Sequence, residues 1–186
     1  MPKQKLSSQL LLGPLPAALI SCGRENGEQN IITLAWVGVV NSDPPMISIA
    51  VRPNRHSYSM IEETKEFTVN IPTVEQADLV DGCGILSGKK INKFDHFGLT
   101  PTKGTLKYAP LIEQCPINME CLVEHKLVLG SHNLFVGRVV QSYADAAIAD
   151  EQGRIDFKRL RMLGFSSGEY FSAAPINLAH GYTVKK

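Results

Sequence analysis

The sequence predicts a mainly β fold, in which short antiparallel strands form a closed or nearly closed barrel accompanied by a few short helices. Segments rich in β-branched and aromatic residues recur along the chain, separated by Gly, Pro, Asn and Asp. Helical periodicity is confined to two short stretches. The strands therefore do not alternate with helices as they do in a doubly wound parallel sheet, which leaves an antiparallel barrel as the favoured architecture.

Six segments are predicted to be strands from their composition or from alternation of apolar residues: 18–22, 30–40, 46–52, 67–71, 117–129 and 134–143. Residues 30–40 are expected to form one continuous strand. Residues 41–45 should then form a turn, because Pro44 and Pro45 cannot donate to a strand ladder. The last two strands are joined through residues 130–133, a linker typical of a β-hairpin of moderate length.

Residues 57–65 and 74–80 are predicted to form helices of about two turns each. In the first of them Tyr58 and Ile61 share one face with Met60 nearby, and we expect that face to point inward. Residues 87–109 lack a clear period and are rich in polar residues, Gly and Lys. An irregular segment of that length in a compact domain is usually functional or ordered by a ligand.

Length and composition predict a single globular domain spanning residues 1–186. Of the 186 residues, 44% are hydrophobic and 20% are charged, as in an average soluble domain. The net charge of +1 argues against nucleic-acid binding, which usually needs a clear basic excess. No segment approaches the ~18 consecutive apolar residues of a membrane helix, and Pro14 and Pro16 interrupt the early apolar run. We therefore expect a cytoplasmic protein that binds neither nucleic acid nor membrane.

Motifs for metal binding, nucleophilic catalysis and dinucleotide binding are missing. The sequence contains no G-x-G-x-x-G, P-loop, H-E-x-x-H or G-x-S-x-G pattern, and its five histidines show no ligand spacing. Its four cysteines, at positions 22, 83, 115 and 121, form no C-x-x-C pair and are expected to be ordinary buried thiols. Cys83, between two glycines, is the cysteine for which a redox role stays open. No catalytic residue and no metal ligand is predicted.

The start of the helix predicted at 57–65 carries charges of unusual sign. A helix N-terminus bears a positive partial charge and prefers Asp or Glu, yet Arg55 and His56 stand here, with Arg52 close by. A phosphate group could compensate by accepting hydrogen bonds from backbone N–H groups, the Ser57 hydroxyl and a guanidinium group. The alternative is that both basic side chains point to water. Either Asn54 or Ser57 could cap the helix.

The segment predicted as a strand over residues 30–40 suggests a place for a flat ring. It carries small or hydroxyl side chains at Thr33 and Ala35 and the only tryptophan of the chain, Trp36. Residues 33, 35 and 37 would share one strand face, and small residues there would let a ring lie against the backbone. The alternative is a plain core strand in which Trp36 serves as a packing anchor.

Taken in order, the motifs resemble those of the flavin reductase-like family, whose members have an FMN-binding split β-barrel, and the flavoredoxin branch in particular. They are N-x-x-T-x-A-W-x-G from Asn30, I-A-V-R-P-x-R-x-S-Y from Ile49 and E-F-T-V-N-I-P from Glu66. The runs S-G-x-K-x-N-K-F-D from Ser87 and G-E-Y-F from Gly168 also fit. The likeness covers roughly residues 12–182, and its specificity lies in the order and spacing of the motifs.

The resemblance implies one non-covalent FMN per subunit and a homodimer with the flavin sites near the subunit interface. It implies that Ser57 holds the phosphate with help from Arg55 or His56, and leaves open whether Arg52 or Arg55 meets it. Lys93 would approach the flavin ring from the long loop. The remaining cofactor contacts are implied for the ring, the ribityl chain and the path between them: Asn30, Thr33, Ala35, Trp36, Ala50, Val51 and Arg52.

The resemblance further implies an FMN-dependent oxidoreductase of the flavin or ferric reductase type. Such a protein would take electrons from NAD(P)H or a reduced electron-transfer protein and pass them to flavin, ferric iron or an electron-transfer partner. The flavin would supply the redox chemistry and the protein its placement and electrostatics, which is consistent with the lack of a catalytic motif. The alternative is a non-catalytic FMN electron-transfer protein.

Overall fold

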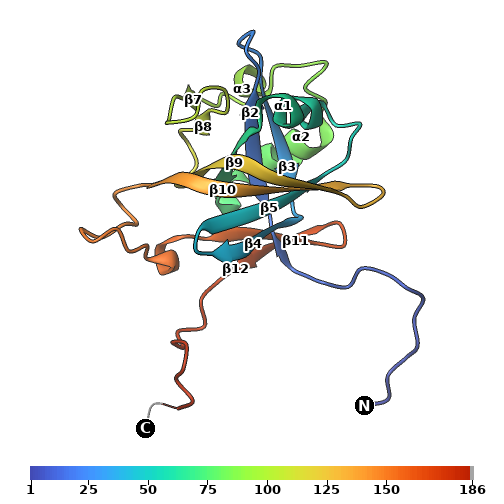
Figure 1. Cartoon of the computed structure of the whole chain (residues 1–186). Helices are drawn as coiled ribbons and strands as arrows, with labels where there is room; N and C mark the ends of the chain where they lie inside the picture. Colours follow the sequence, from blue (N-terminus) through green and yellow to red (C-terminus); the bar gives the residue numbers. More distant parts are fainter. Residues whose placement is uncertain (185–186) are drawn as a thin grey trace.

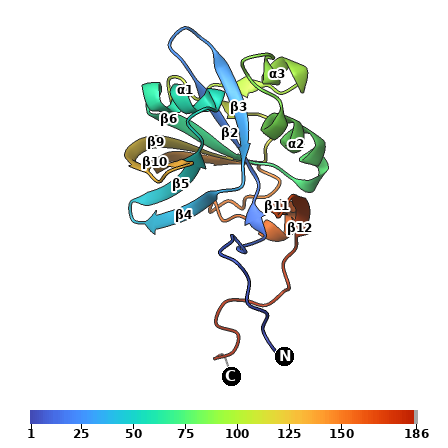
Figure 2. The same ribbon diagram turned by 90° about the vertical axis from the view of Figure 1, so that its right-hand side faces the viewer.

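The computed structural model describes residues 1–184 and has one dominant antiparallel sheet of seven strands, strongly curved into an open barrel (Figures 1 and 2). The strands lie side by side in the order β3, β2, β6, β9, β10, β5, β4. Consecutive strands β3 and β4 thus stand at opposite ends of the sheet. The strands are β2 (Ala18–Gly23), β3 (Gln29–Leu34), β4 (Val37–Ser42), β5 (Pro45–Val51), β6 (Glu66–Ile71), β9 (Ile117–Val128) and β10 (Asn133–Ala144).

The strand expected over residues 30–40 is two strands, and that expectation was wrong. The ladder breaks at Ala35 and Trp36, because β3 pairs with β2 whereas β4 pairs with β5. At the break the Trp36 carbonyl accepts a hydrogen bond from the Ala50 N–H at 3.0 Å. The chain changes from one end of the sheet to the other at this corner. The turn after β4 is also shorter than expected, since Pro45 already pairs with Ser42 at the start of β5.

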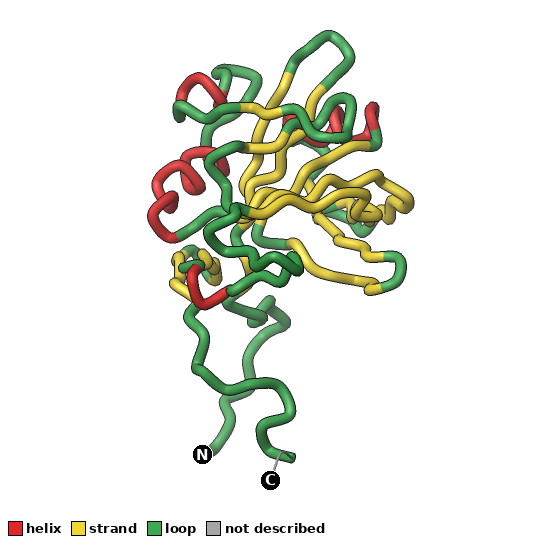
Figure 3. The backbone as a smooth tube through the Cα atoms, turned by 90° about the vertical axis from the view of Figure 1, so that its left-hand side faces the viewer, coloured by secondary structure: helices red, strands yellow, loops and turns green. Residues whose placement is uncertain are grey.

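Within residues 1–184, three short α-helices and two 3-10 helices lie outside the sheet or across its opening (Figure 3). The helix expected at 57–65 is α1 (His56–Thr64), with Tyr58, Met60 and Ile61 buried as predicted. The helix expected at 74–80 is longer, because the 3-10 turn η1 (Val74–Gln76) leads into α2 (Ala77–Ile85). The long irregular segment contains α3 (Lys93–His96) and the strand β7 (Pro101–Thr102), which pairs with β8 (Leu111–Ile112). The 3-10 helix η2 (Phe157–Arg159) comes later in the chain.

A second small sheet near the C-terminus was not expected from the sequence. Its strands are β1 (Leu15–Pro16), β11 (Met162–Ser166) and β12 (Glu169–Ala173), in the order β1, β11, β12. A tight turn with positive φ at Ser167 and Gly168 joins the last two strands. This sheet brings the C-terminal residues Phe165 and Tyr170 against the α2 side of the molecule, where they pack on the second core.

Two cores meet at β2, which is buried along its whole length. Ile20 and Cys22 point into the barrel, where they pack with α1 and with the fully buried rings of Phe67 and Phe135. Leu19 points the other way, into a cluster with side chains from α2 and α3. The apolar run at 18–22 is therefore continuous because both of its faces are covered.

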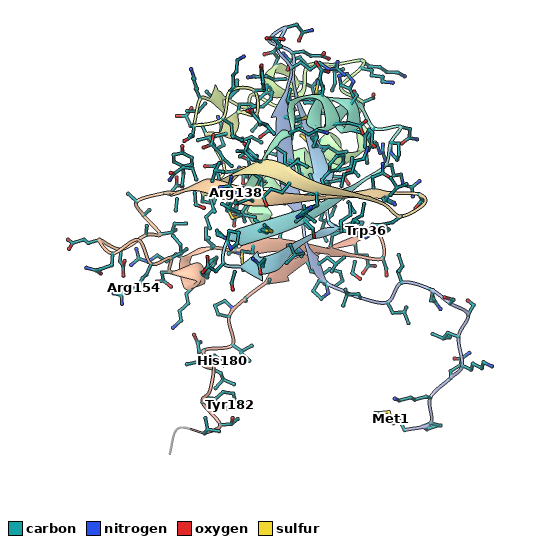
Figure 4. The ribbon with its side chains drawn as sticks, viewed as in Figure 1. Met1, Trp36, Arg138, Arg154, His180 and Tyr182 are labelled. Carbon is teal, nitrogen blue, oxygen red and sulfur yellow. The ribbon has the colours of Figure 1, made fainter. Side chains whose placement is uncertain are left out.

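Both chain ends extend away from the barrel as arms on the same side of the molecule (Figures 1 and 4). Residues 1–14 and 174–180 are exposed throughout. Met1, His180 and Tyr182 mark how far the arms reach from the body (Figure 4). Within residues 1–184, no helix has both the length and the apolar character needed to cross a membrane.

Candidate functional site

Three adjoining cavities run along β3, between the start of α1 and the end of α2. Their volumes are about 90, 90 and 210 Å³. The first two share Ile32, Arg55 and Gly84 in their walls, and the second and third share Thr33 and Gly84. We call the three together the trough, and name its parts the cationic end, the middle and the apolar end.

Buried polar groups form the floor of the cationic end. Ser57, the second residue of α1, is fully buried, and its Oγ accepts a hydrogen bond from Asn30 Nδ2 of β3 at 2.8 Å. Lys93 of α3 is 3% exposed, and its ammonium donates to the carbonyls of Ile31 at 2.7 Å and Cys83 at 2.6 Å. Burial lowers the pKa of Lys93, and nearby Arg55 lowers it further. The structure thus places Lys93 on a helix beneath the trough, beside Ser57.

Helix α1 begins at the cationic end without a side-chain cap. Arg55 occupies the N-cap position, and neither Asn54 nor Ser57 caps the helix, contrary to expectation. No acidic residue lies in its first turn. The uncapped N–H groups and the positive end of the helix dipole therefore face the cavity beside Ser57. This is the arrangement from which the sequence suggested an anion site.

The cations around the trough have few acidic partners. In the part of the chain that the structure describes, no ion pair includes Arg52, Arg55 or Lys93. His56 differs, since its Nε2 lies 2.7 Å from Glu28 Oε1. No carboxylate lines the cationic end or the middle. Three basic side chains without an acidic partner therefore line the cationic end and the middle of the trough.

The middle of the trough is bounded by strand residues and by the β9–β10 hairpin. Ala50 of β5 and Thr33 of β3 line it, together with Arg52 and His132. The His132 ring packs against Trp36 with centroids 4.3 Å apart, and its Nε2 accepts a hydrogen bond from Arg52 Nε at 3.3 Å. Burial lowers the pKa of His132, and the charges of Arg52 and Arg55 lower it further.

The apolar end lies between β3, α2 and the small C-terminal sheet. Ala35, Ile85 and Phe165 line it, and the Tyr170 hydroxyl, also in its wall, donates to Asp81 Oδ1 at 3.1 Å. The Phe165 and Tyr170 rings make an edge contact, with centroids 5.2 Å apart. Burial raises the pKa of Tyr170 to about 12, so its hydroxyl stays protonated and holds the C-terminal hairpin against α2.

Most of the side chains singled out from the sequence line the trough. They are Asn30, Thr33, Ala35, Ala50, Arg52, Arg55, His56, Ser57 and Lys93. Two others are placed differently. The Val51 side chain is fully buried in the barrel core and does not line the trough. Trp36 stands at the strand break on the outside, 43% exposed and packed at a tilt of 42° against His132 (Figure 4).

Several residues that line the trough were not predicted from the sequence. His132 was treated as one of five unremarkable histidines, and Gly84, Gly88 and Asp81 were given no role. A glycine is needed at position 88, because a Cβ there would come within 2.2 Å of Asn30 Oδ1. His132 lies 80 residues from its partner Arg52. Local motif spacing carries no signal for such a contact.

The four cysteines are buried free thiols, as expected. Cys83 lies in α2, close under the trough, and burial raises its pKa to about 11. Burial likewise raises the pKa of Cys22 to about 12. Thiolates are the reactive form of cysteine, so neither side chain is poised for redox chemistry at neutral pH.

Residues 13–174 match the model of the flavin reductase like domain. The chain belongs to the flavin reductase-like family. Among solved structures it is similar to flavoredoxin of Desulfovibrio vulgaris, at 27% identity and a TM-score of 0.90 over 99% of this chain and 100% of that one. It is also similar to flavoredoxin of Methanosarcina acetivorans, at 29% identity and a TM-score of 0.91 over 100% and 98%.

Another relative of this flavin reductase-like chain is an NADH-dependent FMN reductase, AsuE2, of Streptomyces nodosus subsp. asukaensis. The two are 28% identical over 138 residues, which is 73% of this chain and 74% of the relative. Membership of the family accounts for the fold, a split barrel with few short helices whose sheet is not closed.

Proposed function

We propose that this protein is an FMN-dependent oxidoreductase that takes electrons from NAD(P)H or a reduced protein. It passes them to flavin, ferric iron or an electron-transfer partner. The observation that carries the proposal is the trough, which gathers unpaired cations at one end and apolar side chains at the other. FMN has matching chemistry, with an anionic phosphate at one end and a flat ring at the other.

The donor set at the cationic end fits a phosphate. A buried ammonium ion without a carboxylate partner is costly unless another anion neutralises it, and Lys93 is in that position. Ser57 adds a hydroxyl, the start of α1 adds backbone N–H groups, and Arg55, which also lines the cavity, adds a guanidinium. Charge-assisted hydrogen bonds of this kind are the strong ones in proteins.

The middle and the apolar end suit the remainder of the cofactor. Small side chains at Ala35 and Ala50 leave room beside the strand backbone, while His132, which packs against Trp36, forms part of the wall. The Thr33 hydroxyl donates to the Val80 carbonyl, so Thr33 fixes β3 against α2. When bound, FMN would supply the redox chemistry; the chain's residues bind it, orient it and exclude water.

The proposal is tested first by the visible spectrum of the purified protein before and after addition of FMN. We expect a yellow protein, or a colourless one that takes up FMN stoichiometrically. NADH and NADPH oxidation would then be followed with and without free FMN or a ferric chelate. A protein that binds no flavin under any of these conditions would contradict the proposal.

The same assay distinguishes the reductase from an electron carrier. Nicotinamide oxidation that rises with added FMN or ferric chelate supports the reductase, as in the NADH-dependent FMN reductase of Streptomyces nodosus. Bound FMN that is reduced only by dithionite or by a redox protein supports an electron carrier. The similarity to flavoredoxins is the observation that favours this alternative.

Replacing Arg55 and Ser57 together by alanine should weaken FMN binding by more than tenfold. Each charge-assisted phosphate bond that is lost costs about 1.5–3 kcal/mol. Isothermal or fluorescence titration measures the dissociation constant. Arg154→Ala is the matched control, because Arg154 is exposed, pairs with Asp150 and lies away from the trough (Figure 4). An unchanged affinity in the double variant would remove the phosphate from the cationic end.

A further inference from the structure

The Asn30 side chain is buried in the wall of the cationic end and is held on two sides. It is 3% exposed, and its Nδ2 donates to Ser57 Oγ at 2.8 Å. Its Oδ1 faces Gly88, where an added Cβ would come within 2.2 Å. Strand β3, the start of α1 and the segment after α2 thus meet at this one amide. Such a clamped amide has little freedom to turn toward a ligand.

The hydrogen bond from Asn30 determines what the Ser57 hydroxyl can do. A serine hydroxyl has one proton to donate and lone pairs with which to accept. Asn30 donates its N–H to Oγ, so the Ser57 oxygen is the acceptor in this hydrogen bond. The hydroxyl proton of Ser57 is then free to be donated to another partner. Ser57 lines the cationic end of the trough, so that proton is available to an acceptor in the cavity.

Lys93 has a similar arrangement on the same cavity wall. Two of its three N–H groups are taken by the carbonyls of Ile31 and Cys83. The third N–H has no partner among the hydrogen bonds of the described residues, and Lys93 lines the cavity with Ser57. Two buried groups on one wall therefore each retain a donor, which is the arrangement that an oxyanion requires.

We propose that Asn30 is a positioning residue, which fixes the Ser57 hydroxyl as a donor toward the phosphate of a mononucleotide. This inference rests on the proposed function. It adds that the preference of the protein for a flavin with a phosphate over a flavin without one depends on the Asn30 amide that bonds Ser57. An aspartate at position 30 would accept the Ser57 proton instead and turn the donor away from the cavity.

The test is a titration of the flavin-free protein with FMN and, separately, with riboflavin, which lacks the phosphate. Asn30→Ala should weaken FMN binding at least fivefold and change riboflavin binding less than twofold. Asn30→Asp, which keeps the shape of the side chain, should weaken FMN binding more than Asn30→Ala does. Asn41→Ala is the matched control, since Asn41 is an exposed asparagine on β4 that bonds only the Pro44 carbonyl.

A double-mutant cycle shows whether Asn30 acts through Ser57. In the Ser57→Ala background, Asn30→Ala should change FMN affinity less than twofold, because the hydroxyl that it orients is gone. Two results would overturn the proposal. One is an Asn30→Ala variant that loses FMN and riboflavin affinity equally; the other is a double variant whose loss of FMN affinity equals the product of the losses in the two single variants. A wild-type protein that binds neither flavin would instead contradict the proposed function. If Asn30→Ala does not fold, Asn30→Asp is compared with the wild-type protein instead, again by the loss of FMN affinity relative to the loss of riboflavin affinity.

Discussion

At the scale of single residues, His132 links the wall of the trough to pH. In the folded protein its Nε2 accepts from Arg52, so the neutral form is favoured, and burial followed by the charges of Arg52 and Arg55 lowers its pKa. In the unfolded chain a histidine titrates near about 6.5. The stabilising contribution of neutral His132 is therefore present above that pH and is lost as the pH falls toward the lower folded-state pKa.

Trp36 reports this titration directly, because it is the only tryptophan and its ring lies 4.3 Å from that of His132. We expect tryptophan emission to change as the pH is lowered below about 6.5, with a midpoint below that of a free histidine. His132→Gln should abolish the change, whereas His180→Gln in the exposed C-terminal arm should leave it in place. Emission that is independent of pH in the wild-type protein would contradict this contact.

Lys93 should contribute more to ligand binding than to the stability of the flavin-free protein. Burial of its ammonium opposes folding at neutral pH, and methionine has a similar shape without the charge. We expect Lys93→Met to change the free energy of unfolding of the flavin-free protein by less than about 1 kcal/mol. Its FMN affinity should fall about tenfold, which removes about 1.4 kcal/mol of ligand stabilisation at saturating FMN.

Thermal melts with and without FMN measure both quantities for Lys93→Met in one experiment. The FMN-induced rise in melting temperature should be smaller in the variant than in the wild-type protein, while the ligand-free melts stay close. An exposed neighbour, Lys90→Met, serves as the control. The opposite result is a Lys93→Met protein whose melting temperature without ligand is much lower but whose FMN-induced rise in melting temperature equals that of the wild type. It would show that the side chain has a structural role only.

The residues of the candidate site differ in how far the sequence could predict them. Ser57 and Arg55 follow from helix chemistry, because a helix start that carries cations in place of acids indicates an anion. Lys93 and Asn30 came only from the family resemblance, and their buried positions depend on contacts far along the chain, with the Ile31 carbonyl and the Ser57 hydroxyl. His132 depends on how a hairpin folds over β5, which no local pattern encodes.

At the scale of elements, local pattern predicted the existence of strands better than their ends. The six expected segments all contain strands, but the run at 30–40 is rich in β-branched and aromatic residues on both sides of Ala35 and Trp36 and shows no sign of the break there. That break is imposed by pairing, since β3 and β4 join opposite ends of the sheet. The short strands β11 and β12 were missed because each has only five residues beside a polar turn.

The strand β9 holds part of the long segment between α3 and β8 through one buried carboxylate. Glu120 is fully buried and accepts from the backbone N–H groups of Thr105 at 3.0 Å and Leu106 at 2.8 Å. It also accepts from the Tyr143 hydroxyl at 3.1 Å. A carboxylate can satisfy all three donors at once, so this side chain replaces regular secondary structure as the anchor of the segment.

Glu120→Ala should lower the free energy of unfolding by about 3 kcal/mol, because it leaves two backbone donors without an acceptor in a buried place. Glu120→Gln should cost less, since one oxygen still accepts. Glu124→Ala, on the exposed part of the same strand, should stay within about 0.5 kcal/mol of wild type. Urea unfolding measures all three variants; a Glu120→Ala protein as stable as the Glu124→Ala control would show that the segment is held otherwise.

At the scale of the whole molecule, the predicted mainly β split barrel is confirmed, and of the two alternatives, closed or nearly closed, the sheet is not closed. Its end strands β3 and β4 pair with β2 and β5 but not with each other. The trough follows β3 at this opening, beside the corner at Ala35 and Trp36. Pairing between β3 and β4 would cover this edge of β3. The open sheet and the trough therefore both result from the path of the chain between β3 and β4.

The extended arms give the expected homodimer a testable basis. Leu10, Leu11 and Leu12 are 78%, 69% and 80% exposed, so the described part of the chain leaves them largely uncovered. The alignment with the Desulfovibrio flavoredoxin covers 99% of this chain, so the arms lie within the matched region. An extended arm with exposed leucines keeps a defined course most readily against a second molecule. We expect that molecule to be a second copy of the chain.

Changing Leu10, Leu11 and Leu12 to aspartate should convert the dimer into a monomer while the barrel stays folded, because the arm contributes nothing to either core. Size-exclusion chromatography with light scattering gives the mass, and circular dichroism confirms the fold. Lys3→Asp with Lys5→Asp is the matched control, which changes charge in the same arm without removing apolar surface. A wild-type monomer at micromolar concentration would contradict the homodimer itself. A dimer that survives the leucine changes would instead assign the interface to the barrel, where Val39 and Val40 of the edge strand β4 are 80% and 51% exposed.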